Sequence, residues 1–476
     1  MDMKIISTGL LSIALALISC DSLPDEITKQ ENDGSVKISF YPNLEEKELS
    51  TYMTGFNMSY YHDKDALWTD GKLTNGLKEV KTKLLRYPGG AETSYFHWQY
   101  PGCPGYKDLW NPTHGVTPEA VAGITENMDT DEFISICNQL GAEPMLGINI
   151  LSGVVNNKIE ASLQEAKDWV NYCKSKGYKV KYWYLDNEVD HNTSYTQITI
   201  EAYATIINRF SKELKAIDPE MKLIVSLVGN ATQEKFHTLI SLAGKSFDII
   251  DLHFYYGWDV AEWNKWIAQR PMVDIDVNMS YTKEINSLSS YIKDSENPNI
   301  ELVSLEWNIA PTKAGKLSDY QQALMQTEMF QQFLQSDLKM ACIWPLIWQV
   351  EEGTFPSIFN QEDHSPTPLH QILKLYSEAL GNKQVFSISS DLRIIPQCII
   401  GNEKSWVCAI NKSKYEIPVK IEIKEGKQYS NAKVYVVSAD DINGNTCKVS
   451  EVKAEVNGNI VSFTVPAFSF FRVDLN

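Results

Sequence analysis

The stretch "KVKYWYLDNEVDHN", residues 179–192, joins a buried strand to an abrupt polar end. Its first half is rich in β-branched and aromatic residues, which is typical of a strand buried on both faces. It then ends in Asp186, Asn187 and Glu188, two of which carry carboxylates. Strands of a parallel barrel are buried along their length and place polar groups at their carboxyl ends. The stretch therefore predicts a barrel strand that leads into a functional site.

Seven further apolar, strand-like runs lie between residues 50 and 380, and amphipathic helical patterns separate them. The runs are 52–58, 83–89, 143–150, 222–228, 248–254, 300–306 and 340–347. The helical patterns include 131–141, 163–177, 201–218 and 319–335. Eight buried strands that alternate with helices predict an α/β fold, a (β/α)8 TIM barrel over residues 50–380.

The character of the chain changes after Gly381. Its segments there alternate apolar and polar residues between turn signals, as antiparallel strands do. We predict a C-terminal antiparallel β-sandwich over residues 381–476. The early run 35–43 precedes the first barrel strand without a helix between them, so it is a candidate to pair with this sandwich.

The first twenty residues have the pattern of a signal peptide. Lys4 precedes an apolar run that is long enough for a signal core and too short for a bilayer span. The run ends in "LISC", which resembles the lipobox of bacterial lipoproteins and implies that Cys20 is lipidated. The following "DSLPDE" resembles surface-export signals of Bacteroidetes lipoproteins. Residues 1–20 would then be a lipoprotein signal peptide and 21–34 a tether to the outer membrane surface of a Gram-negative bacterium. The alternative is an ordinary cleaved signal with a chance cysteine.

Composition and charge exclude several classes of protein. A formal net charge of -18, from 43 Lys+Arg against 61 Asp+Glu, would repel a phosphate backbone, so we expect no nucleic-acid partner. Beyond Cys20 there are seven cysteines with no CxxC pair, which argues against a zinc site and a disulfide framework, although Cys398 and Cys408 could pair across strands. Gly89 and Gly90 lack the residues of a phosphate loop. We therefore predict no metal and no cofactor.

Polar and aromatic side chains end the predicted strands, where a barrel places its chemistry. In chain order they are Asn57, Arg86, Asn149, Asn187 with Glu188, His253 with Tyr255, Glu306, and Trp344 with Trp348. Glu188 and Glu306 are carboxylates on the fourth and seventh predicted strands. Two carboxylates that face one site are what glycoside hydrolysis requires, one as proton donor and the other as nucleophile or base. The apolar residues before Glu188 would disfavour its charged form, as an acid catalyst needs.

Four stretches resemble, in order, those of the family 51 α-L-arabinofuranosidases of the clan A retaining glycoside hydrolases, with family 39 as a near relation. They are "LLRYPGGAETSYFHW" (84–98), "GAEPMLGINI" (141–150), "KVKYWYLDNE" (179–188) and "LVSLEWN" (302–308). The resemblance covers roughly residues 50–380.

The resemblance implies a role for each matching residue. Glu188 would be the general acid/base and Glu306 the nucleophile. Asn187 would hold the sugar 2-hydroxyl, Arg86 would lie near the nucleophile, and Tyr255 would steady that carboxylate by a hydrogen bond.

Further substrate contacts are expected from side chains at or near the strand ends. The candidates are Asn149, His253, Trp98, Trp307 and Trp348. Aromatic rings could stack on sugar faces or could belong to the core of the loops. His253 could contact substrate or could be a satisfied core histidine.

The chain departs from the family pattern next to both carboxylates. The family typically has Gly-Asn-Glu with a Trp soon after, whereas this chain has Asp186 before the Asn-Glu pair and Val189-Asp190-His191 after it. Leu305 stands where the family usually has an Asp before the nucleophile. These departures leave the substrate open.

The leading hypothesis is a lipid-anchored, arabinofuranosidase-like retaining glycosidase of plant or algal polysaccharide. An endo-acting β-glycanase of the same clan, of the agarase, porphyranase or xylan type, is one alternative. A non-catalytic surface glycan-binding lipoprotein is another, although a pure binder has no need of both carboxylates. Exo or endo action and the oligomeric state stay open.

Overall fold

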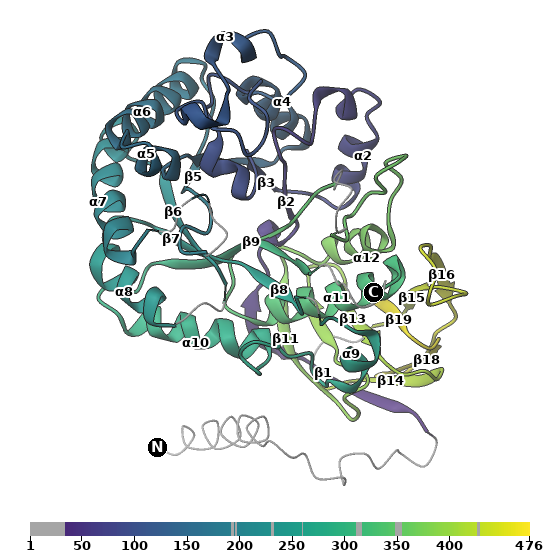
Figure 1. The fold of residues 1–476 in the computed structure, drawn as a ribbon. Helices are drawn as coiled ribbons and strands as arrows, with labels where there is room; N and C mark the ends of the chain where they lie inside the picture. The colour runs from purple at the N-terminus through teal and green to yellow at the C-terminus, as the bar shows by residue number, and fades with distance from the viewer. Residues whose placement is uncertain are drawn as a thin grey trace, which may run out of the picture.

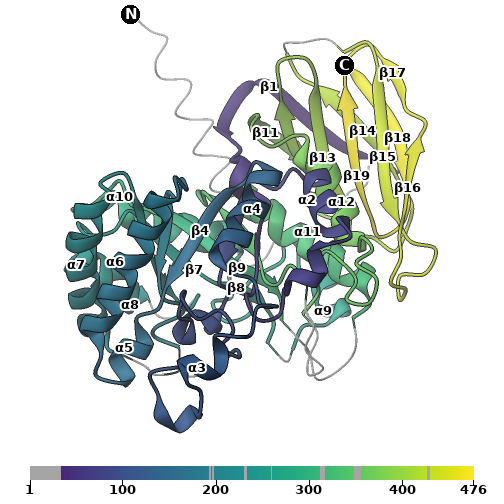
Figure 2. The ribbon, with the colours of Figure 1, turned by 90° about the horizontal axis from the view of Figure 1, so that it is seen from above.

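The computed structural model describes residues 34–476, except for 192–194, 196–197, 230–232, 259, 311–316, 348–354 and 426–428. The fold has two parts, a helix-wrapped barrel of parallel strands and a curled sheet beside it (Figure 1, Figure 2). The predicted signal peptide with Cys20, the tether up to residue 33, and Trp348 lie outside the described residues. Among the helices that are described, none is long and apolar enough to cross a membrane.

Eight parallel strands close the predicted TIM barrel, which is thereby confirmed. They are β2 (Gly55–Asn57), β3 (Leu84–Tyr87), β4 (Glu143–Ile148), β5 (Tyr182–Leu185), β6 (Lys222–Leu227), β7 (Ile249–Leu252), β9 (Glu301–Ile309) and β10 (Ala341–Ile343). The barrel closes because β10 pairs with both β2 and β9. A short strand, β8 (Phe254–Tyr256), continues β7 along β9 after a break at His253.

Helices cover the outside of the barrel (Figure 1). They are α2 (Lys72–Glu79), α3 (Pro118–Val121), α4 (Thr130–Leu140), α5 (Leu151–Val155), α6 (Ile159–Ser175), α7 (Ile200–Ile217), α8 (Gln233–Ala243), α9 (Trp263–Ala268), α10 (Tyr281–Asp294), α11 (Asp319–Gln335) and α12 (Pro368–Ser377). Local sequence sets some of their ends. A capping box of Asp129 and Glu132 starts α4, and Gly141, with φ 63°, ends it.

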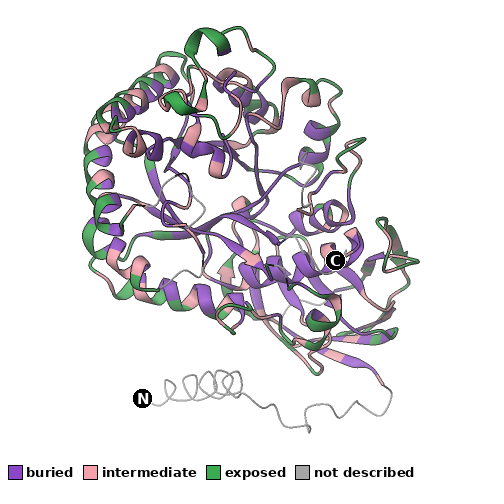
Figure 3. Ribbon diagram, in the orientation of Figure 1, coloured by how far each residue is buried: buried purple, intermediate pink, exposed green. Residues whose placement is uncertain are grey.

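The inside of the barrel is a packed core and not a channel. It is filled by Leu84, Met145, Tyr182, Tyr184, Ile224, Ile249, Val303, Leu305, Met340 and Cys342. Strand neighbours such as Leu85 and Trp183 belong instead to the larger core beneath the helices. Figure 3 shows the barrel strands buried, whereas outer helices such as α7 alternate between buried and exposed positions. This two-sided burial explains why the strands are continuous apolar runs.

A β-bulge interrupts the alternation along β9. Ala341 of β10 lies opposite Ser304, but Ile343 lies opposite Trp307, so β9 holds one extra residue between these pairs. Leu305 therefore faces the inner core, and Trp307 belongs to the core beneath the helices. The residue between them, Glu306, faces the carboxyl-end cavity. Bulges next to active sites commonly re-aim a side chain in this way.

The second part is one curled ten-stranded sheet, in the order β16-β15-β19-β13-β12-β11-β1-β14-β18-β17. Its strands are β1 (Val36–Glu48), β11 (Lys383–Ser389), β12 (Gln397–Ile400), β13 (Ser405–Asn411), β14 (Ile417–Ile423), β15 (Ala432–Ser438), β16 (Lys448–Val452), β17 (Glu455–Asn457), β18 (Ile460–Val465) and β19 (Ser469–Leu475). The early strand β1 lies between β11 and β14. Side chains from both halves of the sheet, such as Val436 and Val461, share one core, so the sheet folds over on itself.

One face of this sheet packs on the barrel. Tyr320 of α11 donates a hydrogen bond to the carbonyl of Phe468, at 2.7 Å, and a buried ion pair joins Lys412 to Glu328, at 2.8 Å. Cys398 and Cys408, which could pair according to the sequence, are both free and buried. Cys398 lies opposite Val407, and the two cysteines belong to cores on opposite faces of the sheet.

Candidate active site

The end of β5 turns sharply because Asp186 acts as an anchor. Asp186 is buried, with φ 63°, and accepts the backbone N–H groups of Ile150 and Leu151 at 2.6 and 2.7 Å and the hydroxyl of Ser94 at 2.6 Å. Burial raises the pKa of Asp186, and these hydrogen bonds oppose the rise. The carboxylate thus ties β5 to the start of α5, and the next residues, Asn187 and Glu188, face the cavity at this end of the barrel.

Arg86, at the end of β3, connects the candidate nucleophile to its surroundings. Its fully buried guanidinium donates to Glu306 Oε1 at 2.8 Å, to Asn187 Oδ1 at 2.6 Å and to Asn57 Oδ1 at 2.9 Å. The guanidinium also lies 4.3 Å from the centre of the Tyr184 ring. This places Arg86 beside the Glu306 carboxylate and holds both groups rigidly.

Glu306 also accepts a hydrogen bond from the Tyr255 hydroxyl to Oε2, at 2.8 Å. Donors on both oxygens fix the orientation of this carboxylate in the cavity, as a positioned nucleophile requires. The bulge in β9 and the break between β7 and β8 bring these two side chains together.

His253 bridges the two candidate catalytic carboxylates. Its Nδ1 lies 2.7 Å from Glu188 Oε1 and 3.5 Å from Glu306 Oε2, and its Nε2 lies 2.9 Å from Asp251 Oδ2. Although burial lowers the pKa of His253, Glu306, Asp251 and Glu188 together raise it well above its usual value. His253 is therefore part of the site, as a cation held among three carboxylates.

Glu188 differs in protonation from the sequence-based expectation. Burial alone would raise the pKa of Glu188. His253 and His191 lower this pKa by more than burial raises it, so the net pKa lies well below its usual value. His191 Nδ1 lies 3.2 Å from Glu188 Oε2. The apolar residues before Glu188 alone would raise its pKa, but the fold places two imidazoles against the carboxylate and their effect is larger.

The cavity that these residues share has a volume of about 290 Å³. Asn187, Glu188, His253, Tyr255 and Glu306 all line it. Six further side chains line the cavity that are not among the predicted catalytic or substrate-binding residues, namely Tyr106, His191, Trp258, Asp276, Trp344 and Phe355. All of them except Trp344 lie on loops after the predicted strands, where hydrophobic periodicity carries no signal. Trp344 ends the last predicted strand, and His191 belongs to the departure from the family pattern next to Glu188.

Three predicted substrate contacts lie away from the cavity. Trp307 is fully buried against Phe330 and Phe333 of α11, because the bulge turns it outward. Trp98 stacks on Trp169 of α6. Asn149 donates to the carbonyl of Phe96, at 3.0 Å, and accepts the N–H of Ser152. These side chains support the loops and helices around the site.

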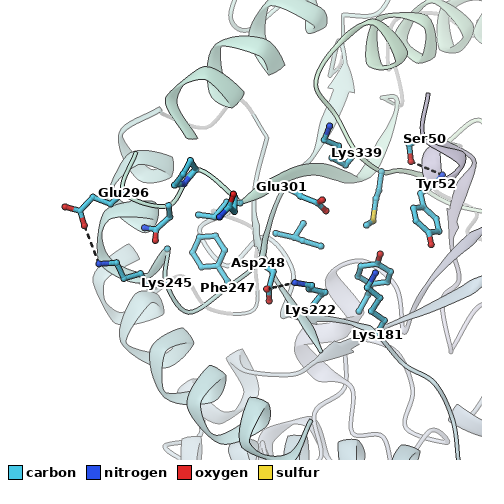
Figure 4. Close-up of a pocket in the computed structure, with 18 residues that line it drawn as sticks. Ser50, Tyr52, Lys181, Lys222, Lys245, Phe247, Asp248, Glu296, Glu301 and Lys339 are labelled. Carbon is cyan, nitrogen blue, oxygen red and sulfur yellow. Dashed lines mark hydrogen bonds and ion pairs between the residues drawn. The ribbon is translucent and has the colours of Figure 1, made fainter. Parts of the chain in front are cut away.

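A larger cavity of about 660 Å³ lies at the opposite, amino-terminal end of the barrel (Figure 4). It is lined by the first residues of several strands, among them Tyr182, Lys222 and Glu301. Its charged groups form exposed pairs, such as Lys222 with Asp248 at 3.1 Å. Barrel chemistry occurs at the other end, so volume alone does not identify the site.

Among the described residues, one group has the composition of a metal site. One nitrogen or oxygen atom from each of Glu188, His253 and Glu306 lies within 4.8 Å of the others. Arg86 and the His253 imidazolium already supply positive charge there. We assign no metal to these residues, and the expectation that none takes part stays a prediction.

Comparisons with known proteins confirm the resemblance found in the sequence. Residues 76–268 match the family model described as the alpha-L-arabinofuranosidase 1 domain. The chain is 31% identical to α-L-arabinofuranosidase C of Emericella nidulans over 209 residues, which are 37% of this chain and 38% of that protein. It is 26% identical to an intracellular exo-α-(1→5)-L-arabinofuranosidase of Halalkalibacterium halodurans over 253 residues, 49% and 48% of the two chains. The chain thus spans less than half the length of these curated relatives.

Solved structures extend the likeness to almost the whole fold. An α-L-arabinofuranosidase from Thermotoga maritima in complex with arabinose aligns with a TM-score of 0.73 at 19% identity, over 92% of this chain and 99% of that chain. A bifunctional glucanase-xylanase, CelM2, from a metagenome library aligns with a TM-score of 0.66 at 15% identity, over 93% and 99%. At such identities the likeness concerns the fold, and it includes both the barrel and the sheet beside it.

Proposed function

We propose that this protein is a retaining glycoside hydrolase in which Glu306 is the nucleophile and Glu188 the general acid/base. One observation carries the proposal: an oxygen of Glu188 and an oxygen of Glu306 lie within 4.8 Å of each other in one cavity. Retaining enzymes hold their two carboxyl groups about 5 to 5.5 Å apart, whereas inverting enzymes need about 6.5 to 9.5 Å to admit a water. The spacing supports retention.

The chemistry proceeds in two displacements. Glu306 attacks the anomeric carbon while Glu188 gives a proton to the departing oxygen, which leaves a glycosyl-enzyme. Glu188 then takes a proton from a water molecule, and the water oxygen releases the sugar from Glu306. Arg86 and Tyr255 keep the Glu306 carboxylate oriented between turnovers. In this proposal Asn187 binds a sugar hydroxyl, which is supported by its position in the cavity lining and by the hydrogen bond that its Oδ1 accepts from Arg86.

For the substrate we propose terminal α-L-arabinofuranosyl units of plant polysaccharide. The family match over residues 76–268 and the names of the matched relatives support this choice. The departures at residues 186 and 189–191 do not alter the two carboxylates. A binding protein without activity would have no need of this charge network around them.

An endo-acting glycanase is the second candidate, and aromatic residues at the cavity favour it. Trp258 is 53% exposed, and its ring lies near those of Tyr255 and Phe355, with centroids 5.4 and 6.0 Å away. Exposed aromatic rings beside a sugar site can hold further units of a chain. A pure exo-enzyme has less use for them.

The stereochemistry and products of hydrolysis test both parts of the proposal. We expect wild-type protein to hydrolyse 4-nitrophenyl α-L-arabinofuranoside and arabinan, with the first product keeping the anomeric configuration by proton NMR. Xylan, agarose and porphyran form the comparison panel. Inverted product, or no turnover on any member of the panel, would contradict the proposal; internal cleavage of a polymer would select the endo candidate.

We also propose that the protein is lipid-anchored through Cys20 on the outer membrane surface. The signal-like residues 1–20 and the acidic stretch after them support this. We expect expression with labelled palmitate to label wild-type protein but not Cys20→Ala. Equal labelling of both proteins would remove the anchor from the proposal.

A further inference from the structure

His191 is placed directly against the candidate acid/base. Its Nδ1 lies 3.2 Å from Glu188 Oε2, and its backbone N–H donates to the carbonyl of Glu188 at 2.8 Å. The turn that makes this contact possible includes Glu188 in the left-handed region, with φ 43°. The ring lines the catalytic cavity, and its side chain is 38% exposed. It can therefore exchange protons with water while it contacts Glu188.

His253, on the other oxygen of Glu188, is held differently. It is 1% exposed at its side chain, and Asp251 occupies its second nitrogen. Asp251 is itself fixed by the N–H of Leu305 at 2.7 Å and the hydroxyl of Ser226 at 2.9 Å. His253 also faces Glu306. It therefore acts as a fixed, buried positive charge between the two carboxylates.

The charges that face His191 come from several elements. Glu188 at the end of β5 raises its pKa through their hydrogen bond, partial burial opposes this, and Asp190 raises it further. His253 from the β7–β8 break acts in the opposite direction. Lys235 of α8 contacts the Asp190 carboxylate at 3.1 Å, and its positive charge weakens the effect of Asp190 on the His191 ring. The other acids of the cavity are Glu306 and Asp276.

We propose, on the basis of the proposed function, that His191 stores the catalytic proton of Glu188. It acts through Glu188 and is a positioning residue for that proton, not a group that touches the sugar. The resting state is a Glu188 carboxylate hydrogen-bonded to a His191 imidazolium. A resting Glu188 that is ionised has no proton to give, and His191 Nδ1, on a partly exposed ring in contact with it, can supply one.

The proton then follows a closed cycle. As substrate binds, the proton on His191 Nδ1 moves to Glu188 Oε2, and Glu188 passes a proton to the glycosidic oxygen as the bond between that oxygen and the anomeric carbon breaks. Glu306 forms the new bond to the anomeric carbon. In the second step Glu188 takes a proton from water, the water oxygen displaces Glu306, and the proton returns to His191. One water is consumed and the site returns to its first state.

The pH dependence of His191→Asn tests the proposal, because an Asn amide can keep a hydrogen bond to Glu188 but cannot carry the proton. In wild-type protein the basic limb, the fall of kcat/KM at high pH, reports loss of the proton that Glu188 and His191 share. In the variant this proton can reside only on Glu188, whose pKa is lower than that of His191. We expect the basic limb to move down by at least about one pH unit.

The leaving group gives a second readout. A 4-nitrophenolate needs little protonation, whereas a sugar alcohol needs it fully. At neutral pH we therefore expect His191→Asn to lose about 10²-fold in kcat/KM on an arabino-oligosaccharide and less than about tenfold on the nitrophenyl glycoside. His237→Gln, on α8 and stacked on Tyr291 of α10, is the matched control and should behave as wild type.

A measurement on wild-type protein does not depend on the folding of a variant. In protein labelled with ¹⁵N-histidine, with resonances assigned by comparison with His191→Asn or His191→Gln, we expect His191 to be doubly protonated at pH 7. A neutral His191 at pH 7, an unmoved basic limb, or an equal loss on both substrates would overturn the proposal. A wild-type protein without glycosidase activity would instead overturn the proposed function, so the two failures are distinguishable.

Discussion

The two ends of the barrel are built from the same strands but differ in how their charged side chains are exposed to water. At the carboxyl end, Arg86, His253, Glu188 and Glu306 form one buried network around a cavity of about 290 Å³. At the amino end, a cavity of about 660 Å³ is lined by partly exposed lysines and carboxylates in pairs (Figure 4). Water screens the second set of charges and barely reaches the first. Charge that is fixed and desolvated, rather than cavity size, distinguishes the candidate site.

The sharpest test compares two glutamates of the same strand. Glu306 lies near the carboxyl end of β9, and Glu301 begins the strand, exposed, at the amino end. We expect Glu306→Ala to lower kcat by at least about 10⁴-fold, because the nucleophile is lost. Glu301→Ala should stay within about twofold of wild type. Initial rates on the nitrophenyl glycoside measure both, and comparable losses would break the distinction between the two ends.

Glu188→Gln should have the next largest effect. Without its proton donor the protein should lose about 10² to 10⁴-fold in kcat/KM on an oligosaccharide, and less on the nitrophenyl glycoside. Glu143→Gln, at the start of β4 and thus at the amino end, is the control. For each variant we would measure kcat/KM on the nitrophenyl glycoside and on the oligosaccharide. The ratio of the first value to the second should rise in Glu188→Gln and stay as in wild type in Glu143→Gln. An unchanged ratio in Glu188→Gln would remove Glu188 from the acid/base role.

Arg86→Met should destabilise the fold as well as the site. It leaves Glu306, Asn187 and Asn57 without their buried donor, which typically costs about 3 to 5 kcal/mol. Lys222→Met removes an exposed pair at the amino end and should cost less than about 1 kcal/mol. Urea unfolding measures both variants. Similar losses in the free energy of unfolding would mean that a buried charge network at one end is no more important for stability than an exposed ion pair at the other.

The loop above the carboxyl end should make stability depend on pH. His97 lies between Asp108 and Glu165, at 3.0 Å from each; burial lowers its pKa, but the two carboxylates raise it to about 9. Its folded pKa therefore exceeds the unfolded value, so its contribution is complete below about pH 6.5 and is lost as the pH rises through about 9. The loss is at most about 3 to 4 kcal/mol, since each pKa unit corresponds to about 1.36 kcal/mol.

Melting temperatures between pH 6 and 10 measure this effect. We expect wild-type protein to lose Tm across this range more steeply than His97→Gln, which is less stable at pH 6 but lacks this titration. His237→Gln serves again as the control and should follow wild type. Parallel curves for wild type and His97→Gln would show that His97 contributes nothing to the pH dependence.

Periodicity was sufficient for the barrel and for the strands that carry its chemistry. Each predicted run contains a strand in the structure, because a strand that is buried on both faces is apolar along its length. Arg86, Asn187, Glu188 and Glu306 were identified because they interrupt those runs at their carboxyl ends. The alternation of apolar and polar residues predicts antiparallel strands after Gly381. It does not predict that these strands and β1 form one continuous ten-stranded sheet, because strand order depends on contacts between residues distant in sequence.

The barrel, its two carboxylates and the family that they resemble are all legible in the amino-acid sequence, since they follow from local patterns and short motifs. The directions of the side chains and their neighbours depend on the folded arrangement of distant segments. The bulge in β9 turned Trp307 away from the cavity and Glu306 into it, and Asp186 became an anchor for α5. The protonation of Glu188 was decided in the same way, because His191 and His253 act on its carboxylate through space. Charge interactions depend on distance, and distance between separate strands is set by the fold alone.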